Sequence, residues 1–442
     1  MNDMATGNNT ALTELSERLR RVIEAEGAGA IASWRLNLTH SNVIKVGIDS
    51  NHLGGPYSAP RNVDQLVGEV FIVWKDGRRT IARVDPGSLA NPDLAGAWKG
   101  SAFADPDQVD VLSPAPMPKV DIFSEKVSAA VQSPGSEFFA PLTQYAALKG
   151  QAQFINAGVN AAVSRSVLLS SAGHDLAWSA TDYSTSIGFD SLYDDYYTGC
   201  AFPEPGTIEA MIDRVARRYG ELSTAPRGWL ASGEMEVLLE PDVVEGLIGH
   251  YLLGNMLGSN VANGQSAYRP EDFGSRHIVR EDLSLRLEPL RPLHPGSYVC
   301  TREGVPAAEL TLVDKGLLVS PILDVKYANR LGKQPTPLAN GTDSLVLHCS
   351  LEKETQIMQG DAASMLVCSV LGLHTQDPTS GNFSLTAGQA LEVQRDGSVG
   401  GKIKAVFSGN LFNALNEKST RFARVPGKDF PMMRLRCRVT LE

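Results

Sequence analysis

The segment with the clearest chemical potential joins an expected strand to an expected helix that carries an acid, glycines and a histidine. It runs Leu238-Leu-Glu-Pro-Asp-Val-Val-Glu-Gly-Leu-Ile-Gly-His250, so Glu245 and His250 stand five positions apart. In an ideal helix, positions i and i+5 differ by about 140°, whereas i and i+4 differ by about 40°. A pair at i and i+5 therefore needs a local bulge before both side chains can reach one metal ion. Zinc would also require a third protein ligand, an open position for water and a carboxylate that takes the proton.

Common catalytic signatures are absent from the chain. The sequence contains no Walker A loop, no G-x-G-x-x-G after an expected strand, no G-x-S-x-G and no H-E-x-x-H helix. The eight histidines are scattered, and no two lie within one helical turn. A Ser/His/Asp triad stays open because its members assemble from distant positions, although no segment points to one.

Two glycine-rich segments near the carboxyl end accompany the helix. One is Leu371-Gly-Leu-His-Thr-Gln-Asp-Pro-Thr-Ser-Gly-Asn-Phe-Ser384, and the other is Gly401-Lys-Ile-Lys-Ala-Val-Phe-Ser-Gly-Asn-Leu-Phe412. Together with the helix, these segments resemble the TldD/PmbA family, whose PmbA member is also called TldE. The resemblance is strongest over residues 230–416 and weaker but consistent in the amino-terminal half, for example at Ser170-Ser-Ala-Gly-His-Asp175.

The resemblance implies a fold and an activity. TldD-type subunits are zinc metallopeptidases with an H-E-x-x-x-H helix. PmbA/TldE-type subunits share the fold, lack the motif and pair with the TldD-type subunit. The resemblance further implies that the pair trims or degrades small unfolded peptides, including peptide precursors of natural products.

Matched onto that motif, Glu245 replaces the first histidine, Gly246 replaces the catalytic glutamate, and His250 is the second histidine. Glycine has no side chain to act as a base, and general-base help contributes about 10²–10⁴ to a rate. The pattern assigns no third ligand, since Cys437 is the only late cysteine. We therefore expect no catalytic residue, metal or cofactor on this chain and zinc on a partner subunit. The simplest interpretation of His250 is a packed core histidine, with a residual metal site or a partner contact as alternatives.

Two other segments are candidates for contact with a ligand. We expect the segment His374–Ser384 to form a loop beside the cleft, with its conformation set by Pro378 and Gly381. The residues of this loop that could contact a peptide are His374, Asp377, Ser380 and Gly381. The aromatic run Tyr193-Asp-Asp-Tyr-Tyr197 could line an interface or a substrate entrance, but a solvated loop is the preferred interpretation. On the last strand the alternation of Arg434, Arg436 and Arg438 predicts one solvated face rather than a nucleic-acid patch.

Composition narrows the class of protein. The 442 residues suggest two or three domains, and 43% hydrophobic with 20% charged residues exclude disordered, collagenous and coiled-coil chains. A net charge of −10 disfavours a general nucleic-acid binder. The five cysteines form no C-x-x-C pair, which indicates free thiols in a reducing compartment. The polar segment Met1–Thr10 and the short apolar run Val243–Leu257 favour a cytoplasmic protein without a membrane span.

The periodicities predict an α+β protein with two domains. Residues 1–222 would form a mixed α/β domain, and residues 223–442 a β-rich domain, with the boundary at Ser223–Gly228. A helix with an apolar stripe from Leu12 should end at Gly27, and another should follow Gly206. Asp324 should cap a short helix, and nearly everything after residue 344 should be strand and turn. Hairpin turns are expected at Asp76-Gly77, Asp314-Lys-Gly316 and Asp396-Gly397.

The sequence thus predicts the TldE-type, metal-free partner of a TldD-like zinc-bearing subunit. Its role would be to close a cavity around a small unfolded peptide, with no nucleic acid or membrane involved. Two alternatives stay open: a self-sufficient hydrolase with a rebuilt site in small-molecule biosynthesis, and a homodimeric binding or regulatory protein without catalysis. A homodimer is also compatible with the isolated chain.

Overall fold

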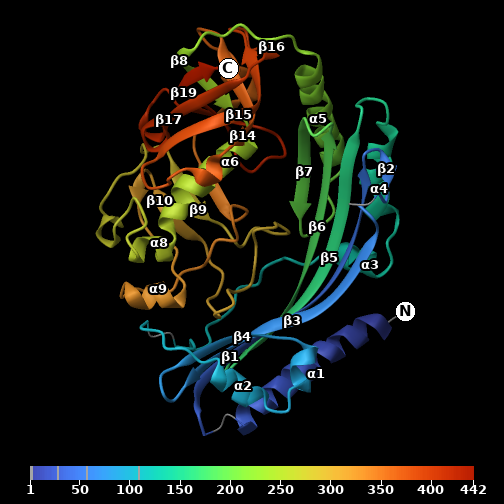
Figure 1. Ribbon diagram of the computed structural model, residues 1–442, viewed down its shortest axis with the longest axis vertical. Coiled ribbons are helices and arrows are strands. Elements are labelled where there is room, and N and C mark those ends of the chain that lie inside the picture. Colours follow the sequence, from blue (N-terminus) through green and yellow to red (C-terminus); the bar gives the residue numbers. More distant parts are fainter. Residues whose placement is uncertain (1–2, 27–28, 56–57, 108–109) are drawn as a thin grey trace.

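The computed structural model describes residues 3–26, 29–55, 58–107 and 110–442. Within these residues the strands form three sheets, one in the amino-terminal half (to residue 224) and two in the carboxyl-terminal half (Figure 1). Helices and strands are largely segregated, so the predicted α+β class is confirmed. No helix in the described ranges is both long and apolar enough to cross a lipid bilayer.

The amino-terminal half is a long antiparallel sheet with the order β4-β3-β1-β5-β6-β7, and β2 pairs with β1. Its strands are β1 Ile31–Asp49, β2 His52–Leu53, β3 Arg61–Trp74, β4 Arg79–Val84, β5 Ile155–Ser170, β6 Asp175–Phe189 and β7 Tyr193–Gly199. Its helices are α1 Asp3–Glu26, α2 Leu94–Gly100, α3 Glu125–Gln132, α4 Ser136–Ala147 and α5 Thr207–Thr224.

Two apolar clusters hold these helices to the sheet. Helix α1 buries Leu12, Leu15, Leu19 and Ile23, which recur at helical spacing, against β1 and β3. Helices α3, α4 and α5 pack on the same sheet farther along its length. Figure 1 shows α1 and α2 at one end of the sheet and α5 at the other, beside β7. The end that carries α5 and β7 faces the carboxyl-terminal half.

The carboxyl-terminal half holds a four-stranded sheet and an eight-stranded sheet within the described residues. The smaller sheet has the order β11-β10-β9-β12, and the larger follows β13-β18-β19-β17-β15-β14-β8, with β16 on β15. The strands are β8 Gly233–Leu239, β9 Ser284–Leu287, β10 Leu310–Asp314, β11 Leu317–Leu318, β12 Leu345–His348, β13 Leu351–Lys353, β14 Ser364–Leu371, β15 Asn382–Val393, β16 Val399–Lys402, β17 Ala405–Asn410, β18 Arg421–Arg424 and β19 Met432–Leu441.

Short helices connect these strands, and one of them crosses the main core. They are α6 Pro241–Leu247, α7 Gly254–Met256, α8 Gly258–Ala262, α9 Val325–Arg330, α10 Glu354–Ile357 and α11 Leu411–Asn416. Strand β8 lies between β14 and β19 and runs directly into α6, whose Val244 and Leu247 are fully buried. The main apolar cluster gathers around this strand and helix, so the segment that the sequence singled out is held at the centre of its half.

Most predicted turns and caps are confirmed. Gly77 (φ 81°), Gly316 (φ 80°) and Gly397 (φ 87°) adopt left-handed conformations at the three expected hairpins. The Asp324 side chain accepts a hydrogen bond from the amide of Tyr327, as expected for a helix cap. The end expected at Gly27 lies outside the described residues. The predicted domain boundary falls between the end of α5 and the start of β8, and it stays a prediction.

Three expectations were wrong. The run Tyr193–Tyr197 is the edge strand β7 rather than a solvated loop, because it pairs with β6, Asp195 is buried, and the Tyr193 ring packs against the carboxyl-terminal half. Arg434 does not share a solvated face with Arg436, since its side chain is fully buried and ion-paired with Glu236. The region after residue 344 also contains two short helices, α10 and α11, which are too brief to show an apolar stripe.

Candidate functional site

The helix that carries Glu245 and His250 is not regular. It begins as α6 at Pro241, which lacks an amide hydrogen and is therefore well suited to a first turn. From Ile248 to Leu253 it widens into a π-helical turn before α7 continues. Such turns are rare and occur often at functional sites. A pair at i and i+5 would need such a bulge to reach one metal ion, and the structure has one here. The residues around it differ from those of a zinc helix.

Glu245 and His250 have different partners. The hydroxyl of Thr342 donates to Glu245 Oε1 over 2.5 Å. Burial raises the pKa of the Glu245 carboxyl, and the bond from Thr342 only partly offsets this. His250 Nε2 lies 3.0 Å from the carbonyl oxygen of Gln376, and because a carbonyl can only accept, Nε2 carries the proton. That nitrogen is therefore not available to a metal ion in this arrangement.

Gly246 stands between these two residues and has little room for a side chain. A Cβ atom placed there would lie 3.1 Å from a methyl group of Leu373. In the part of the chain that the structure describes, no group of three His, Cys, Asp or Glu side chains is arranged to hold a metal ion. Cys437 lies in the apolar core, where it is almost fully buried. The expectation that this chain carries no metal stays a prediction.

The loop predicted beside the cleft lies against this helix. His250 contacts the Gln376 carbonyl, and the side-chain amide of Asn255 donates to the Pro378 carbonyl over 2.8 Å. The Asp377 carboxylate accepts bonds from the amide and hydroxyl of Thr379, which lowers its pKa, and the Ser380 hydroxyl donates to the Asp377 carbonyl. The loop is thus held by bonds within it, by the helix, and by Asn410, whose side-chain amide donates to the Ser380 carbonyl over 2.9 Å.

Two of the candidate loop residues differ in exposure. The His374 side chain is exposed, whereas Gly381 is buried beneath the ring of Phe412. None of His374, Asp377, Ser380 and Gly381 is among the described residues that line the cavity between the two halves. The loop contacts the helix at His250 and Asn255, whereas the cavity is lined by Pro241, Asp242 and Glu245 at the start of the helix.

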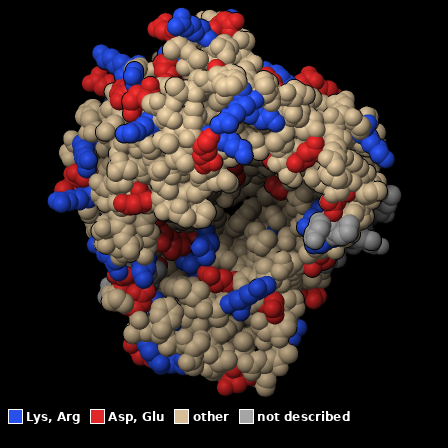
Figure 2. Space-filling model, turned by 45° about the horizontal axis from the view of Figure 1, so that its top comes forward, with Lys and Arg blue, Asp and Glu red and all other residues tan. Residues whose placement is uncertain are grey.

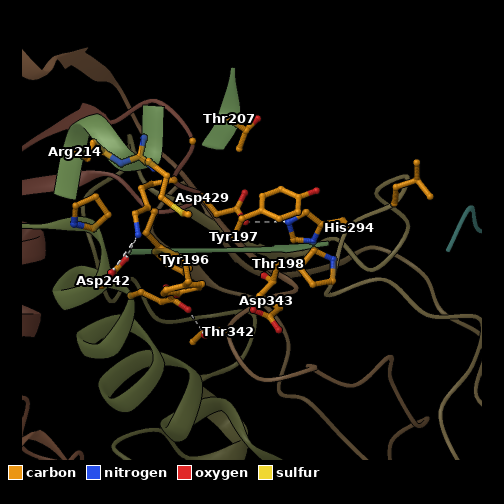
Figure 3. Close-up of a pocket in the computed structure, with 18 of the residues that line it drawn as sticks. Tyr196, Tyr197, Thr198, Thr207, Arg214, Asp242, His294, Thr342, Asp343 and Asp429 are labelled. Carbon is orange, nitrogen blue, oxygen red and sulfur yellow. Dashed lines mark hydrogen bonds and ion pairs between the residues drawn. The ribbon is translucent and has the colours of Figure 1, made fainter. Parts of the chain in front are cut away.

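The cavity between the halves has a volume of about 340 Å³. Strand β7 and helix α5 form its amino-terminal wall, and helix α6 with three loops forms its carboxyl-terminal wall (Figure 3). Figure 2 shows the surface of the molecule deeply hollowed near its centre, with charged side chains at the rim. The polar lining residues include Tyr196, Tyr197, Thr198, Thr207, Arg214, Asp242, Glu245, His294, Thr342, Asp343, Lys428 and Asp429.

The cations of the cavity are already held by carboxylates. The Lys428 ammonium lies 2.7 Å from Asp195 and 2.9 Å from Asp242, and Arg214 lies 2.8 Å from Asp195. Burial alone would lower the pKa of Lys428, but the two carboxylates raise it above its usual value. Of these three pairs, Lys428–Asp195 crosses between the halves, because Asp195 belongs to β7 and Lys428 to the carboxyl-terminal half. Among the described lining residues, no Lys or Arg is thus left free to bind an anion.

A second group of polar contacts surrounds Asp429, the residue after Lys428. His294 Nε2 is 2.9 Å from Asp429, which also pairs with Arg291 at 3.1 Å. The bond from His294 and the nearby guanidinium keep the pKa of Asp429 low despite burial. The amide of Gly296 donates to His294 Nδ1, so this ring nitrogen accepts and Nε2 is the donor. His294 is thereby oriented with both nitrogens engaged.

Two carboxylates of the cavity have no such partner. Among the described residues, neither Glu245 nor Asp343 forms an ion pair with Lys, Arg or His. Burial raises the pKa of Asp343, and the nearby guanidinium of Arg291 opposes this only in part. A cation bound beside these acids would offset the cost of keeping them charged in a partly buried site.

Tyr196 connects this cavity to a second one on the face of the amino-terminal sheet. The second cavity, about 350 Å³, is lined by small and polar residues of β1, β5 and β6, including Lys45, Gly47, Asn160 and Ser186. Tyr196 lines both cavities and is 43% exposed. An extended chain of several residues could thus run from the sheet past Tyr196 to helix α6.

A buried network fixes helix α6 against the amino-terminal half. The carboxylate of Glu240, the residue just before α6, accepts a 2.8 Å bond from Arg218 of α5 and another from the Tyr193 hydroxyl of β7. All three side chains are largely removed from solvent. This network sets the position of α6, and hence of Glu245, relative to β7.

Sequence reasoning missed most residues of this site. Tyr193–Tyr197 was noted for its aromatic rings, but nothing in the sequence paired it with Glu240. Thr342, Asp343, His294 and Lys428 lie in loops without a motif, so only the fold brings them together. The one local signal for Glu240 was its place directly before the helix-starting Pro241, and its burial is seen only in the structure.

Comparison with known proteins agrees with this architecture. Residues 232–426 match the family described as PmbA/TldA metallopeptidase C-terminal domain. An uncharacterized protein of Methanocaldococcus jannaschii is 25% identical over 288 residues, which are 61% of this chain and 65% of that relative, just under two thirds of its length. The crystal structure of TldE from Thermococcus kodakarensis superimposes with a TM-score of 0.81, covering 96% of this chain and 100% of that one at 16% identity. The fold of the whole chain is therefore that of TldE.

Proposed function

Since the chain belongs to the PmbA/TldD family through residues 232–426, we propose that it is a TldE-type subunit that holds a peptide for a zinc-bearing relative. The observation that carries the proposal is helix α6 with its π-helical turn. Gly246 stands where a base is needed, and Glu245 and His250 are engaged by Thr342 and by the Gln376 carbonyl. The zinc, the base and the activated water would belong to the partner subunit, and the pair would act in the cytoplasm.

The cavity between the halves supports the peptide-holding part of the proposal. It is open, joins a second cavity through Tyr196, and offers hydroxyls, aromatic rings and two unpaired carboxylates. Extended peptides bind to such surfaces through backbone hydrogen bonds and side-chain pockets. A folded protein could not enter a space of about 340 Å³, so selection for short unfolded peptides follows from the size.

Complementation tests the proposal. The purified chain is mixed with a relative that carries the H-E-x-x-x-H helix, and cleavage of a fluorogenic peptide is followed. We expect hydrolysis in the mixture at least about 10²-fold faster than with either chain alone, the scale of a missing general base. Full-rate cleavage by this chain alone would contradict the proposal. A mixture that cleaves the peptide no faster than the motif-bearing relative alone would show that the two chains do not act as a pair.

The unpaired acids predict a preference among peptides. Peptides that carry a Lys or Arg should bind this chain about 10-fold more tightly than otherwise identical peptides with Glu. The double variant Glu245→Gln/Asp343→Asn should lose the preference. Glu281→Gln/Asp314→Asn, which removes the same charge from exposed positions outside the cavity, should keep it. Isothermal titration calorimetry measures both, and equal binding of the two peptides by the unmodified chain would refute the assignment.

The same preference should depend on pH. The pKa values of Glu245 and Asp343 are both raised by burial, so these groups become neutral at a higher pH than ordinary carboxyls. Attraction for a cationic peptide is therefore present at neutral pH and declines as the pH falls through these raised values. A preference that persists down to the usual range of exposed carboxyls would exclude these two acids as its source.

A further inference from the structure

Trp229 is the most exposed large apolar side chain in the described residues, with 86% of its surface accessible to solvent. It lies in the connection between α5 and β8, beside the carboxyl end of the chain and β16 at the top of Figure 1. Isolated exposed apolar side chains are common on protein surfaces. The surroundings of Trp229 distinguish it from such cases.

The backbone around Trp229 is fixed. The amide of Gly228 donates to the Lys402 carbonyl over 2.9 Å, and the amide of Lys402 donates to the Pro226 carbonyl over 2.7 Å. The amide of Trp229 itself donates to the Glu392 carboxylate over 3.1 Å. A Cβ atom on Gly228 would lie 2.4 Å from Ile403, so glycine permits this close approach. The indole is therefore presented from an ordered segment rather than from a loose loop.

A groove of about 840 Å³ adjoins Trp229. Its walls include Pro226, Leu230, Ile403 and Leu441, so an apolar residue could be enclosed there. Residues that dominate binding energy at protein interfaces are often Trp or Arg in such pockets. A preformed groove with a fixed tryptophan lowers the entropy lost on binding.

The groove is positively charged in a chain that is acidic as a whole. Arg227, Lys402 and Lys404 line it and are exposed, and in the described residues none of them forms an ion pair with a carboxylate. Among the described lining residues the one acid is Glu442, whose main-chain oxygen accepts a 3.2 Å bond from Arg227. Since the chain carries a net charge of −10, three cations against one acid at this groove mark a local reversal of sign.

We propose that this groove docks an acidic segment of another protein, with one aromatic or aliphatic residue packed on Trp229. Charge complementarity favours glutamate and aspartate around the anchor, and the apolar walls require the anchor itself. A nucleic acid is a poorer fit, because phosphate binding relies on a longer track of cations than these three. The site is separate from the cavity between the halves and does not depend on the peptide-holding role.

Calorimetry with a defined probe tests the proposal. The probe is a ten-residue peptide of glutamates with one central phenylalanine, and its counterparts have lysines or a central serine. We expect saturable binding of the first peptide, weakened at least about 10-fold by either change and by raising salt from about 50 mM to about 500 mM. Trp229→Ala and Lys402→Glu/Lys404→Glu should each weaken it at least about 10-fold.

Matched controls separate the groove from general surface effects. Leu371→Ala removes another exposed apolar side chain (62% accessible), and Lys333→Glu/Lys353→Glu reverses two exposed cations elsewhere. Both should bind the acidic peptide like the unmodified chain. Since all these positions are at the surface, loss of fold is not expected, and circular dichroism checks it. No saturable binding up to about 1 mM, equal binding of the lysine peptide, or tighter binding of a single-stranded oligonucleotide would each overturn the proposal.

Discussion

Replacing Arg218 with methionine is expected to lower the free energy of unfolding by about 3–5 kcal/mol, because it leaves the buried carboxylate of Glu240 without its cation. The guanidinium is 5% exposed and lies 2.6 Å from Glu240, which is 7% exposed. Methionine retains the apolar length of the side chain, so the loss reports the charge rather than a cavity. Urea unfolding followed by circular dichroism measures the change.

Arg217 on the same helix provides the control. Its guanidinium is 52% exposed and pairs with Glu354, so Arg217→Met should cost less than about 1 kcal/mol. The double variant Arg218→Met/Glu240→Gln should be more stable than Arg218→Met, since both charges are then removed. If Arg218→Met costs no more than Arg217→Met, the network does not fix helix α6 and the positioning argument fails.

Gly381→Ala is expected to cost about 2–5 kcal/mol. Its φ of 71° lies in the left-handed region, which costs other residues about 1–2 kcal/mol. A Cβ atom there would also lie 2.5 Å from the ring of Phe412, and such overpacking costs about 1–3 kcal/mol. The movement needed to relieve this contact should also shift the loop that holds the Gln376 carbonyl against His250.

Gly341 separates the two contributions. Its φ of 56° is equally left-handed, but an added Cβ atom would meet nothing within 4 Å. Gly341→Ala should therefore show only the conformational cost of about 1–2 kcal/mol. Thermal unfolding of the two variants gives the comparison, and equal losses would mean that Phe412 moves aside without cost.

Local chemistry accounts for the parts of the fold that could be predicted. Leu12, Leu15 and Leu19 carry the helical period of α1, and the cap at Asp324 and the turn at Asp396-Gly397 follow from short-range hydrogen bonding and backbone freedom. β1 runs from Ile31 to Asp49 without a break, because its middle is paired on both sides although polar residues interrupt its pattern.

The site itself was only partly predictable. Glu245, Gly246 and His250 were recognised by resemblance, whereas the π-helical turn at Ile248–Leu253 is seen only in the structure. Tyr193, Arg218 and Glu240 meet only because β7 and α5 pack against the end of β8, and no local pattern encodes that contact. Arg434 was misplaced for the same reason, since the backbone carbonyls of Ile357 and Gln359 cover it.

We propose that this chain lacks the metal chemistry of the PmbA/TldA metallopeptidases that residues 232–426 match, and that it serves a partner that has it. The most direct measurement is the transition-metal content of the isolated chain, together with its peptide hydrolysis, before and after His250→Ala. We predict far less than one tightly held ion per chain, and no hydrolysis that depends on His250. One ion per chain that is lost, along with peptidase activity, in the variant would contradict the account.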